Sequence, residues 1–316
     1  MKLRRLFIVC TLALLSLSAM AQSPEAVLES IRKYPNLGIT VGSTYPSVPL
    51  RELAAAPEGF EPFYFSLVGR HGSRYEANAK HPAEVVSYFK KNDKQGLLTP
   101  KGKEAKALFE KIKVLQEGRI GELTQIGAEQ HKGIARRMYD HFKPVFQRGA
   151  IIDSRSSDYP RCILSMAAFN ESLKECNPLI ETRLVASESD QKMIRPLGPL
   201  ASTYHHNIRR DNPHCWDSIV EKWAEKQNFS HAISALFTDI KPICNHFGES
   251  EIYVISSIYK RLAFMQNLGW HDRSFLDSIF TAEERHAIYK YETYRLFCIF
   301  SGTSLPDSNK YFATMH

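Results

Sequence analysis

The hydrophobic positions of this chain repeat mainly with a helical period. Ile134, Met138 and Phe142 recur every fourth residue, and the hydroxyl residue Thr124 precedes the run where an N-cap is expected. A spacing of four places side chains on one face of a helix, so this pattern predicts an amphipathic helix packed on a core. Patterns of the same kind over 216–223 and 252–268 predict that residues 214–300 are mainly helical.

Two shorter apolar runs favour β-strands instead. Residues 63–68 read Phe-Tyr-Phe-Ser-Leu-Val, and residues 150–152 read Ala-Ile-Ile. Short apolar runs that end at glycine or polar residues are typical of buried strands. Strands mixed with helices predict an α/β protein.

A second amphipathic helix is predicted soon after residue 152. Ser156, Ser157 and Asp158 offer N-caps, and Pro160 suits the first helical turn because its missing N–H has no partner there. The apolar stripe of this helix consists of Cys162, Met166, Phe169 and Leu173.

Composition agrees with a folded protein of ordinary kind. The chain has 316 residues, of which 43% are hydrophobic and 24% are charged. This balance excludes a disordered tail and a small disulfide scaffold. Because a single hydrophobic core stops growing at about 250–300 residues, two lobes are expected.

The first 21 residues resemble an export signal. Lys2, Arg4 and Arg5 precede an apolar run from Leu6 to Leu17, and Ala19-Met20-Ala21 forms a small-x-small cleavage site. The run is shorter than the roughly 20 residues that span a bilayer. We therefore expect a periplasmic or secreted protein without a membrane anchor. Removing the three basic residues of this segment lowers the net charge from +7 to +4, a mild excess that does not predict nucleic-acid binding.

Cysteine and metal-ligand spacing is not diagnostic. Five cysteines follow the predicted signal peptide, so at least one thiol stays unpaired, and the pairing of the others is open. A loop holds His205, His206, His214 and Cys215, but it has no CxxC or HExxH spacing. We expect no metal and no cofactor. The GxSxG, GxxxxGK[ST] and GxGxxG motifs are absent, which argues against a serine hydrolase, a P-loop enzyme and a dinucleotide enzyme.

Candidate chemistry is concentrated in Gly-Arg-His-Gly-Ser-Arg at residues 69–74. The cluster follows the predicted strand 63–68, where open α/β sheets place ligands. The guanidinium groups of Arg70 and Arg74 suit bidentate contact with phosphate oxygens, and His71 is the nucleophile between them. Gly72 is expected to keep space free beside the imidazole. The alternative is a basic surface turn.

A third arginine supports the same chemistry. Arg161 lies in the first turn of the predicted helix, where free N–H groups and a positive partial charge favour anions. A surface ion pair is the alternative for Arg161. Arg155, on the loop before that helix, is a less specific candidate for the same pocket. His131, Arg136 and Arg137 are expected to be solvated.

These residues together resemble a known family. Arg-His-Gly-Ser-Arg, Leu-Thr-x-x-Gly at 123–127 and Ser-Ser-Asp-x-x-Arg at 156–161 are similar to motifs of the histidine phosphatase superfamily, in its acid phosphatase and phytase branch. Residues 57–75 are particularly similar to exported bacterial multiple inositol-polyphosphate phosphatases. Motifs support the resemblance over about residues 40–180.

The resemblance implies both a fold and a reaction. The expected fold is an α/β/α sandwich core at residues 22–190, a helical cap lobe at 191–300 and a truncated return to the core at 301–316. His71 would accept a phosphoryl group, and Arg70, Arg74 and Arg161 would hold it, with Arg155 as a further contact to substrate. The implied substrate is an inositol phosphate such as phytate.

The sequence departs from that family in one respect. Relatives carry a second histidine beside an acid, His-Asp or His-Ala-Glu, on a later strand, and this sequence reaches His316 without such a strand. His271-Asp272 is a weak substitute because Asp272 suits the start of a helix, and His231 and His286 are each followed by Ala-Ile. We therefore expect an incomplete sheet. A phosphate-binding protein without activity, or an inactive fragment, stays open as an alternative.

Overall fold

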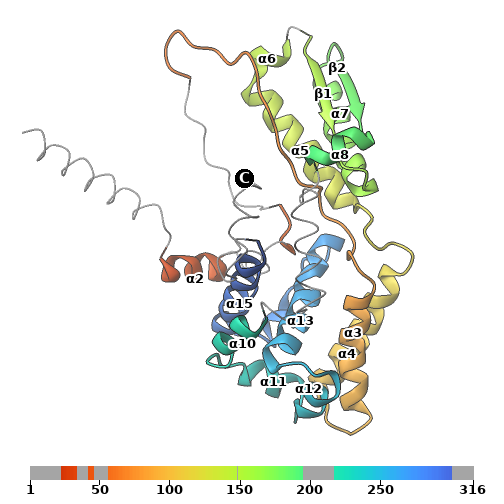
Figure 1. The fold of residues 1–316 in the computed structure, drawn as a ribbon, viewed down its shortest axis with the longest axis vertical. Helices are drawn as coiled ribbons and strands as arrows, with labels where there is room; N and C mark the ends of the chain where they lie inside the picture. Colours follow the sequence, from red (N-terminus) through yellow and green to blue (C-terminus); the bar gives the residue numbers. More distant parts are fainter. Residues whose placement is uncertain (1–22, 34–41, 46–55, 148, 195–216, 301–316) are drawn as a thin grey trace, which may run out of the picture.

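The computed structural model describes residues 23–33, 42–45, 56–147, 149–194 and 217–300 (Figure 1). The predicted signal peptide, residues 301–316 and the loop with His205, His206, His214 and Cys215 lie outside these ranges. Cys162, Cys176 and Cys244 are free thiols.

The described chain is mostly helical and contains one small sheet. The elements in chain order are α2 (Pro24–Lys33), α3 (Lys80–Asp93), α4 (Pro100–Gln116), α5 (Gln125–His141), α6 (Lys143–Gln147), β1 (Ile151–Arg155), α7 (Pro160–Cys176), β2 (Glu181–Val185), α8 (Glu188–Ile194), α10 (Asp217–Ala224), α11 (Ser230–Leu236), α12 (Lys241–Phe247), α13 (Glu251–Phe264), the 3₁₀ helix η2 (Met265–Leu268), α14 (Ser274–Asp277) and α15 (Ala282–Phe300). In these ranges no helix is long and apolar enough to cross a bilayer.

The sheet is a βαβ unit. Strands β1 and β2 pair in parallel, with Ile151 opposite Glu181 and Arg155 opposite Val185, and α7 connects them. Helix α5 packs along α7 in the upper half of Figure 1. This confirms the predicted strand at 150–152 and both predicted amphipathic helices.

The helix caps agree with the sequence in one case and differ in the other. Thr124 caps α5 as predicted, because its hydroxyl accepts a hydrogen bond from the Gly127 N–H at 3.2 Å. Helix α7 starts at Pro160, so its N-cap is Tyr159 rather than the preceding polar residues. The Ser156 hydroxyl donates instead to the Ser157 carbonyl, and the Asp158 N–H donates to Gln191 of α8.

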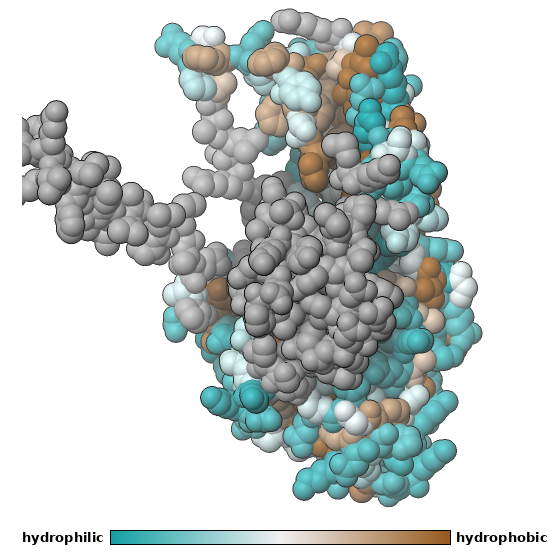
Figure 2. Space-filling model, in the orientation of Figure 1, coloured by the Kyte–Doolittle hydropathy of each residue, from teal (hydrophilic) through white to brown (hydrophobic). Residues whose placement is uncertain are grey.

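The predicted strand at 63–68 is wrong. The segment has no ladder, because neither β1 nor any other described segment pairs with it. A strand needs such a partner to satisfy its backbone groups. Phe63 and Val68 are 90% and 97% exposed, whereas the Phe65 ring packs 5.1 Å from Phe146. Apolar residues therefore lie on the surface of the part that holds the sheet (Figure 2).

The described sheet thus has two strands rather than the layered sheet of the predicted sandwich. What the structure supports is a mixed fold, mainly helical, with a parallel sheet.

Buried apolar side chains form two clusters. The smaller one lies around the βαβ unit and consists of Ala135, Phe146, Phe169, Leu173 and Ile180. The larger one joins α3 and α4 to the helices from α10 to α15, as in the packing of Phe89 against Phe109 and Phe237. Helices α3 and α4 precede residue 190 and pack with helices that follow it. The predicted domain boundary at residue 190 stays a prediction.

Candidate active site

A cavity of about 460 Å³ contains the histidine that the sequence singles out. Its walls come from the segment 42–45, the loop 67–74, helix α5 and the junction of α13 with η2. The lining residues are Gly42, Ser43, Thr44, Tyr45, Leu67, Val68, Gly69, Arg70, His71, Gly72, Ser73, Arg74, Gln130, His131, Ile134, Phe264 and Asn267.

Residues at the start of α5 hold the loop 70–74 in place. The N–H of Ser73 donates to the Gln130 side chain at 2.8 Å, and the Gln130 amide returns a bond to the Ser73 hydroxyl at 3.0 Å. The Thr124 hydroxyl donates to the Ser73 carbonyl at 3.0 Å. Arg74 forms an isolated antiparallel bridge with Leu123. The loop is thus fixed by α5 rather than by a strand ladder.

Gly72 is required by close packing of two backbones. Its N–H donates to the Ser165 hydroxyl of α7 at 3.0 Å, and a Cβ on Gly72 would lie 2.6 Å from the Gly127 Cα. The expectation that Gly72 makes room for the imidazole is therefore corrected, because the group it accommodates is the first turn of α5. A Cβ on Gly69 would meet nothing within 4 Å.

His71 is oriented through its own neighbour. The imidazole Nδ1 lies 2.8 Å from the Gly72 carbonyl oxygen. A carbonyl only accepts, so Nδ1 carries the proton and Nε2 keeps its lone pair. The pKa of His71 is lowered from 6.5 to about 4, mainly by burial and also by the charges of the three arginines, while the bond to Gly72 opposes this shift. The imidazole is neutral at pH 7.

The three arginines form one electrostatic group with His71. Burial is the main cause that lowers the pKa of Arg70 and of Arg74, and the charge of Arg161 contributes to both shifts. Arg161 is not among the lining residues. Its guanidinium lies 4.4 Å from the centre of the Tyr159 ring, and a Cβ on Gly121 would lie 3.5 Å from its Nη1. The Nε atoms of Arg74 and Arg161 are buried without an acceptor among the described residues.

A buried ion pair lies next to these arginines. Glu76 and Arg261 of α13 are paired at 2.8 Å between Oε1 and Nε, and their side chains are only 4% and 12% exposed. The Glu76 charge raises the pKa of Arg74, partly opposing the effect of burial. Sequence reasoning missed this pair, since the two residues are far apart in the chain.

The expectation that His131 is solvated is wrong. His131 is 9% exposed, and its Nε2 lies 3.0 Å from the Arg70 carbonyl oxygen, so Nε2 donates. Burial lowers the pKa of His131. The sequence spacing could have indicated this burial. His131 is four residues from both Gly127 and Ala135, and all three are buried on one face of α5. Arg136 is exposed as expected and pairs with Glu175 of α7.

Arg155 is not brought to the cavity. It ends β1 and forms an ion pair with Asp190 of α8, and its side chain is 61% exposed. Its predicted contact with substrate has no geometric support in the described residues.

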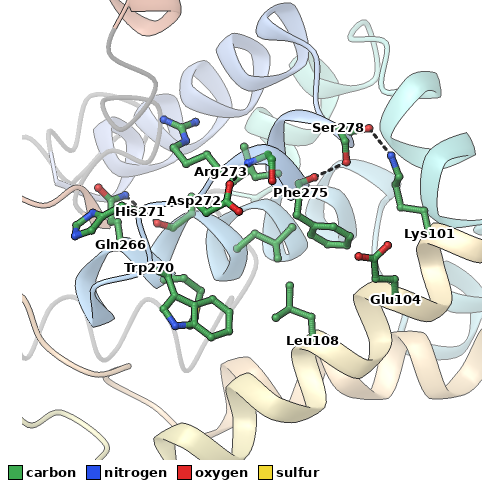
Figure 3. Close-up of a pocket in the computed structure, with 15 residues that line it drawn as sticks. Lys101, Glu104, Leu108, Gln266, Trp270, His271, Asp272, Arg273, Phe275 and Ser278 are labelled. Carbon is green, nitrogen blue, oxygen red and sulfur yellow. Dashed lines mark hydrogen bonds between the residues drawn. The ribbon is translucent and has the colours of Figure 1, made fainter.

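His271 and Asp272 line a different cavity, of about 830 Å³, between α4 and residues 262–278 (Figure 3). Asp272 accepts a hydrogen bond from the Ser274 N–H at 2.9 Å, as expected for a residue at the start of a helix. His231 bonds the Ile279 carbonyl within the helical part. Among the described residues, the His71 cavity is lined by no Asp or Glu. No three His, Cys, Asp or Glu side chains gather as metal ligands there or elsewhere in the described ranges.

Comparison with solved structures finds a similar fold in one enzyme. The chain superposes on the multiple inositol polyphosphate phosphatase of Bifidobacterium longum, in its complex with inositol hexasulfate, with a TM-score of 0.62 and 15% identity over 83% of this chain and 70% of that one. A second structure of that enzyme, with phosphate, gives a TM-score of 0.46 and 17% identity over 84% and 60%. No protein-family model and no curated protein sequence matches. At this identity the first match shows a similar fold.

Proposed function

We propose that this chain is a phosphomonoester hydrolase in which His71 becomes phosphorylated, and that its substrates are inositol polyphosphates. The observation that carries the proposal is a neutral, oriented imidazole within the field of three arginine charges. That combination suits attack on a dianionic phosphate ester, whose charge must be neutralised in the transition state.

In the first step the lone pair of Nε2 forms a bond to phosphorus. The bond between phosphorus and the ester oxygen breaks, and the leaving alkoxide takes a proton from a water molecule. The Gly72 carbonyl holds the Nδ1 proton and stabilises the charge that develops on the ring. Water then attacks the phosphohistidine, the P–N bond breaks, and inorganic phosphate leaves.

The arginines supply charge and orientation in this scheme. The guanidinium groups of Arg70 and Arg74 stay protonated at neutral pH although burial lowers the pKa of each. The two buried Nε–H groups that lack acceptors would gain them from phosphate oxygens. Arg161 also lies in the first turn of α7, where the helix dipole favours an anion. Three such charges can act without a metal, so we expect turnover to survive a chelator.

The charge of the cavity supports the proposed substrate class. The described lining includes Arg70 and Arg74 and no Asp or Glu, which favours a ligand with several phosphates. The similarly folded phosphatase is named for inositol polyphosphates. The basic and apolar start of the chain supports export to the periplasm or the medium.

A second function is favoured by the lining of the cavity. Protonation of the leaving group is worth about 10²–10⁴ in rate, and no carboxylic acid lines the described cavity. A protein that binds phosphate esters without cleaving them is therefore the alternative. An intermediate outcome is turnover only of aryl phosphates, whose leaving groups need little protonation.

The test measures turnover and the intermediate together. Wild type and His71→Ala are assayed for phosphate release from phytate and from an aryl phosphate, and wild type is quenched in alkali for detection of a phosphohistidine peptide by mass spectrometry. Release that is lost in His71→Ala, with phosphate on His71, supports the hydrolase. Binding without release or phosphohistidine supports the alternative.

A further inference from the structure

The 3₁₀ helix η2 reaches across to the N-terminal wall of the His71 cavity. The Gln266 side-chain oxygen accepts a hydrogen bond from the Thr44 hydroxyl at 2.9 Å and a longer one from the Thr44 N–H at 3.5 Å. The Asn267 side-chain amide donates to the Gly42 carbonyl at 3.0 Å. Two adjacent amides therefore hold one short segment that is more than 220 residues away in the chain.

The orientation of both amides is fixed by a second contact. The Gln266 nitrogen donates to the Ala263 carbonyl at 2.8 Å, which leaves its oxygen to accept from Thr44. The Asn267 nitrogen also donates to the Phe264 carbonyl at 3.1 Å. Gln266 and Asn267 are 7% and 4% exposed, so a lost partner would leave a buried polar group unsatisfied.

The segment that they hold is a wall of the cavity. Gly42, Ser43, Thr44 and Tyr45 all line it, together with Asn267 itself. The other end of the segment meets α5, where the Tyr45 ring lies 5.2 Å from the Arg137 guanidinium. The segment is thus held from two elements, η2 and α5.

We propose that Gln266 and Asn267 are positioning residues that set the size of the substrate pocket by holding the wall 42–45. The inference rests on the proposed function for the identity of the substrate. The wall lines the same cavity as His71, so its placement should matter most to the parts of a large ester that do not react. A bulky inositol polyphosphate should depend on the wall, whereas inorganic phosphate, held by the arginines, should not.

The experiment uses binding, so that it does not depend on turnover. Calorimetry on the full chain measures the affinity for inositol hexasulfate and for inorganic phosphate. Inositol hexasulfate carries no phosphoryl group that His71 could accept. The variants are Gln266→Met, Thr44→Val and their double mutant, with Asn267→Leu as a second disruption of the contact. Asn92→Leu is the matched control, because Asn92 is a buried amide that bridges to the Asp239 carbonyl at 2.7 Å and does not line the cavity.

We expect each single variant at Gln266, Thr44 or Asn267 to weaken the binding of inositol hexasulfate at least fivefold. The affinity for inorganic phosphate should change less than twofold. The double mutant should bind inositol hexasulfate no more weakly than either single variant, because the two residues act through one contact. Asn92→Leu should lower the melting temperature without this selectivity. Equal losses for both ligands, additive effects in the double mutant, or the same selectivity in Asn92→Leu would overturn the inference.

Failure of the proposed function has a separate signature. If wild type releases no phosphate from any ester but the selective loss of hexasulfate binding is found, the positioning role stands and the hydrolase is refuted. If turnover is normal and the binding selectivity is absent, only the positioning role is refuted.

Discussion

His131 donates a hydrogen bond from Nε2 to the carbonyl oxygen of Arg70, at 3.0 Å. The bond fixes the backbone immediately before His71 and comes from a helix, α5, that also holds Ser73. Two successive parts of the reactive loop are therefore tied to one rigid element. This relationship defines His131 as a positioning residue for the proposed nucleophile.

We predict that His131→Leu lowers kcat on an aryl phosphate by about 10²-fold, because small displacements of a reacting group have effects of that size. His131→Gln places an amide N–H near the position of Nε2 and should recover most of this loss. Circular dichroism melts separate the effect on turnover from unfolding. Equal losses in the two variants would contradict the role of the hydrogen bond.

The protonation of His71 gives a prediction about pH. Burial and three arginine charges lower its pKa to about 4, so an NMR titration of this imidazole should have its midpoint near that value. Bound inorganic phosphate should raise the pKa, since an anion favours the charged ring. A midpoint above 6 without phosphate would show that the ring is not in this environment.

The same shift links His71 to stability. The unfolded state takes up a proton near pH 6.5 and the folded state only near pH 4, so the free energy of unfolding falls as pH drops between these values. His71→Gln removes this contribution. Urea melts at pH 7 and pH 5 should therefore show a smaller loss on acidification in His71→Gln than in wild type.

Gly72 and Gly69 provide a matched pair in the same loop. A Cβ on Gly72 would overlap the backbone of Gly127, whereas one on Gly69 meets open space. Gly72→Ala should cost about 1–3 kcal/mol of stability and most of the activity, because the loop must move away from α5. Gly69→Ala should resemble wild type in both thermal melting and turnover. Tolerance of Gly72→Ala would mean that the two backbones are not in contact.

Arg161 and Arg155 separate the proposed phosphate site from a surface ion pair. Arg161→Ala should reduce kcat/KM by more than about 10²-fold, and Arg161→Lys should recover only part of it, because a lysine cannot reproduce the planar fork. Arg155→Ala removes an exposed pair with Asp190 and should cost about 0–1 kcal/mol with turnover unchanged. A large catalytic loss in Arg155→Ala would restore its predicted contact with substrate.

The sequence predicted the features that local physics determines. Thr124 as an N-cap, Pro160 in a first turn and the spacing of Phe169 and Leu173 each depend on neighbours within one helix, and these predictions were confirmed. The grouping of Arg70, His71 and Arg74 was available for the same reason, as they lie within five residues.

What the sequence could not predict depends on distant partners. The run 63–68 has the composition of a strand, but a strand is defined by the segment that pairs with it, and none of the described residues does so. His131, Gln266 and Asn267 have no motif, since their roles come from carbonyls and hydroxyls brought near by the tertiary fold. The pair of Glu76 with Arg261 is hidden for the same reason.

The exposed apolar segment leads to a prediction about solubility. Phe63 and Val68 are almost fully exposed, while Phe65, two residues after Phe63, packs on Phe146. An extended apolar segment without a paired strand favours association between copies. Phe63→Ser with Val68→Ser should therefore reduce light scattering during heating and leave the melting temperature within about 2 °C, because exposed positions contribute little to stability. Phe65→Ser removes a packed ring and should lower the melting temperature by several degrees. If the double variant is destabilised as strongly as Phe65→Ser, the segment is covered in solution and the exposed surface described above is wrong.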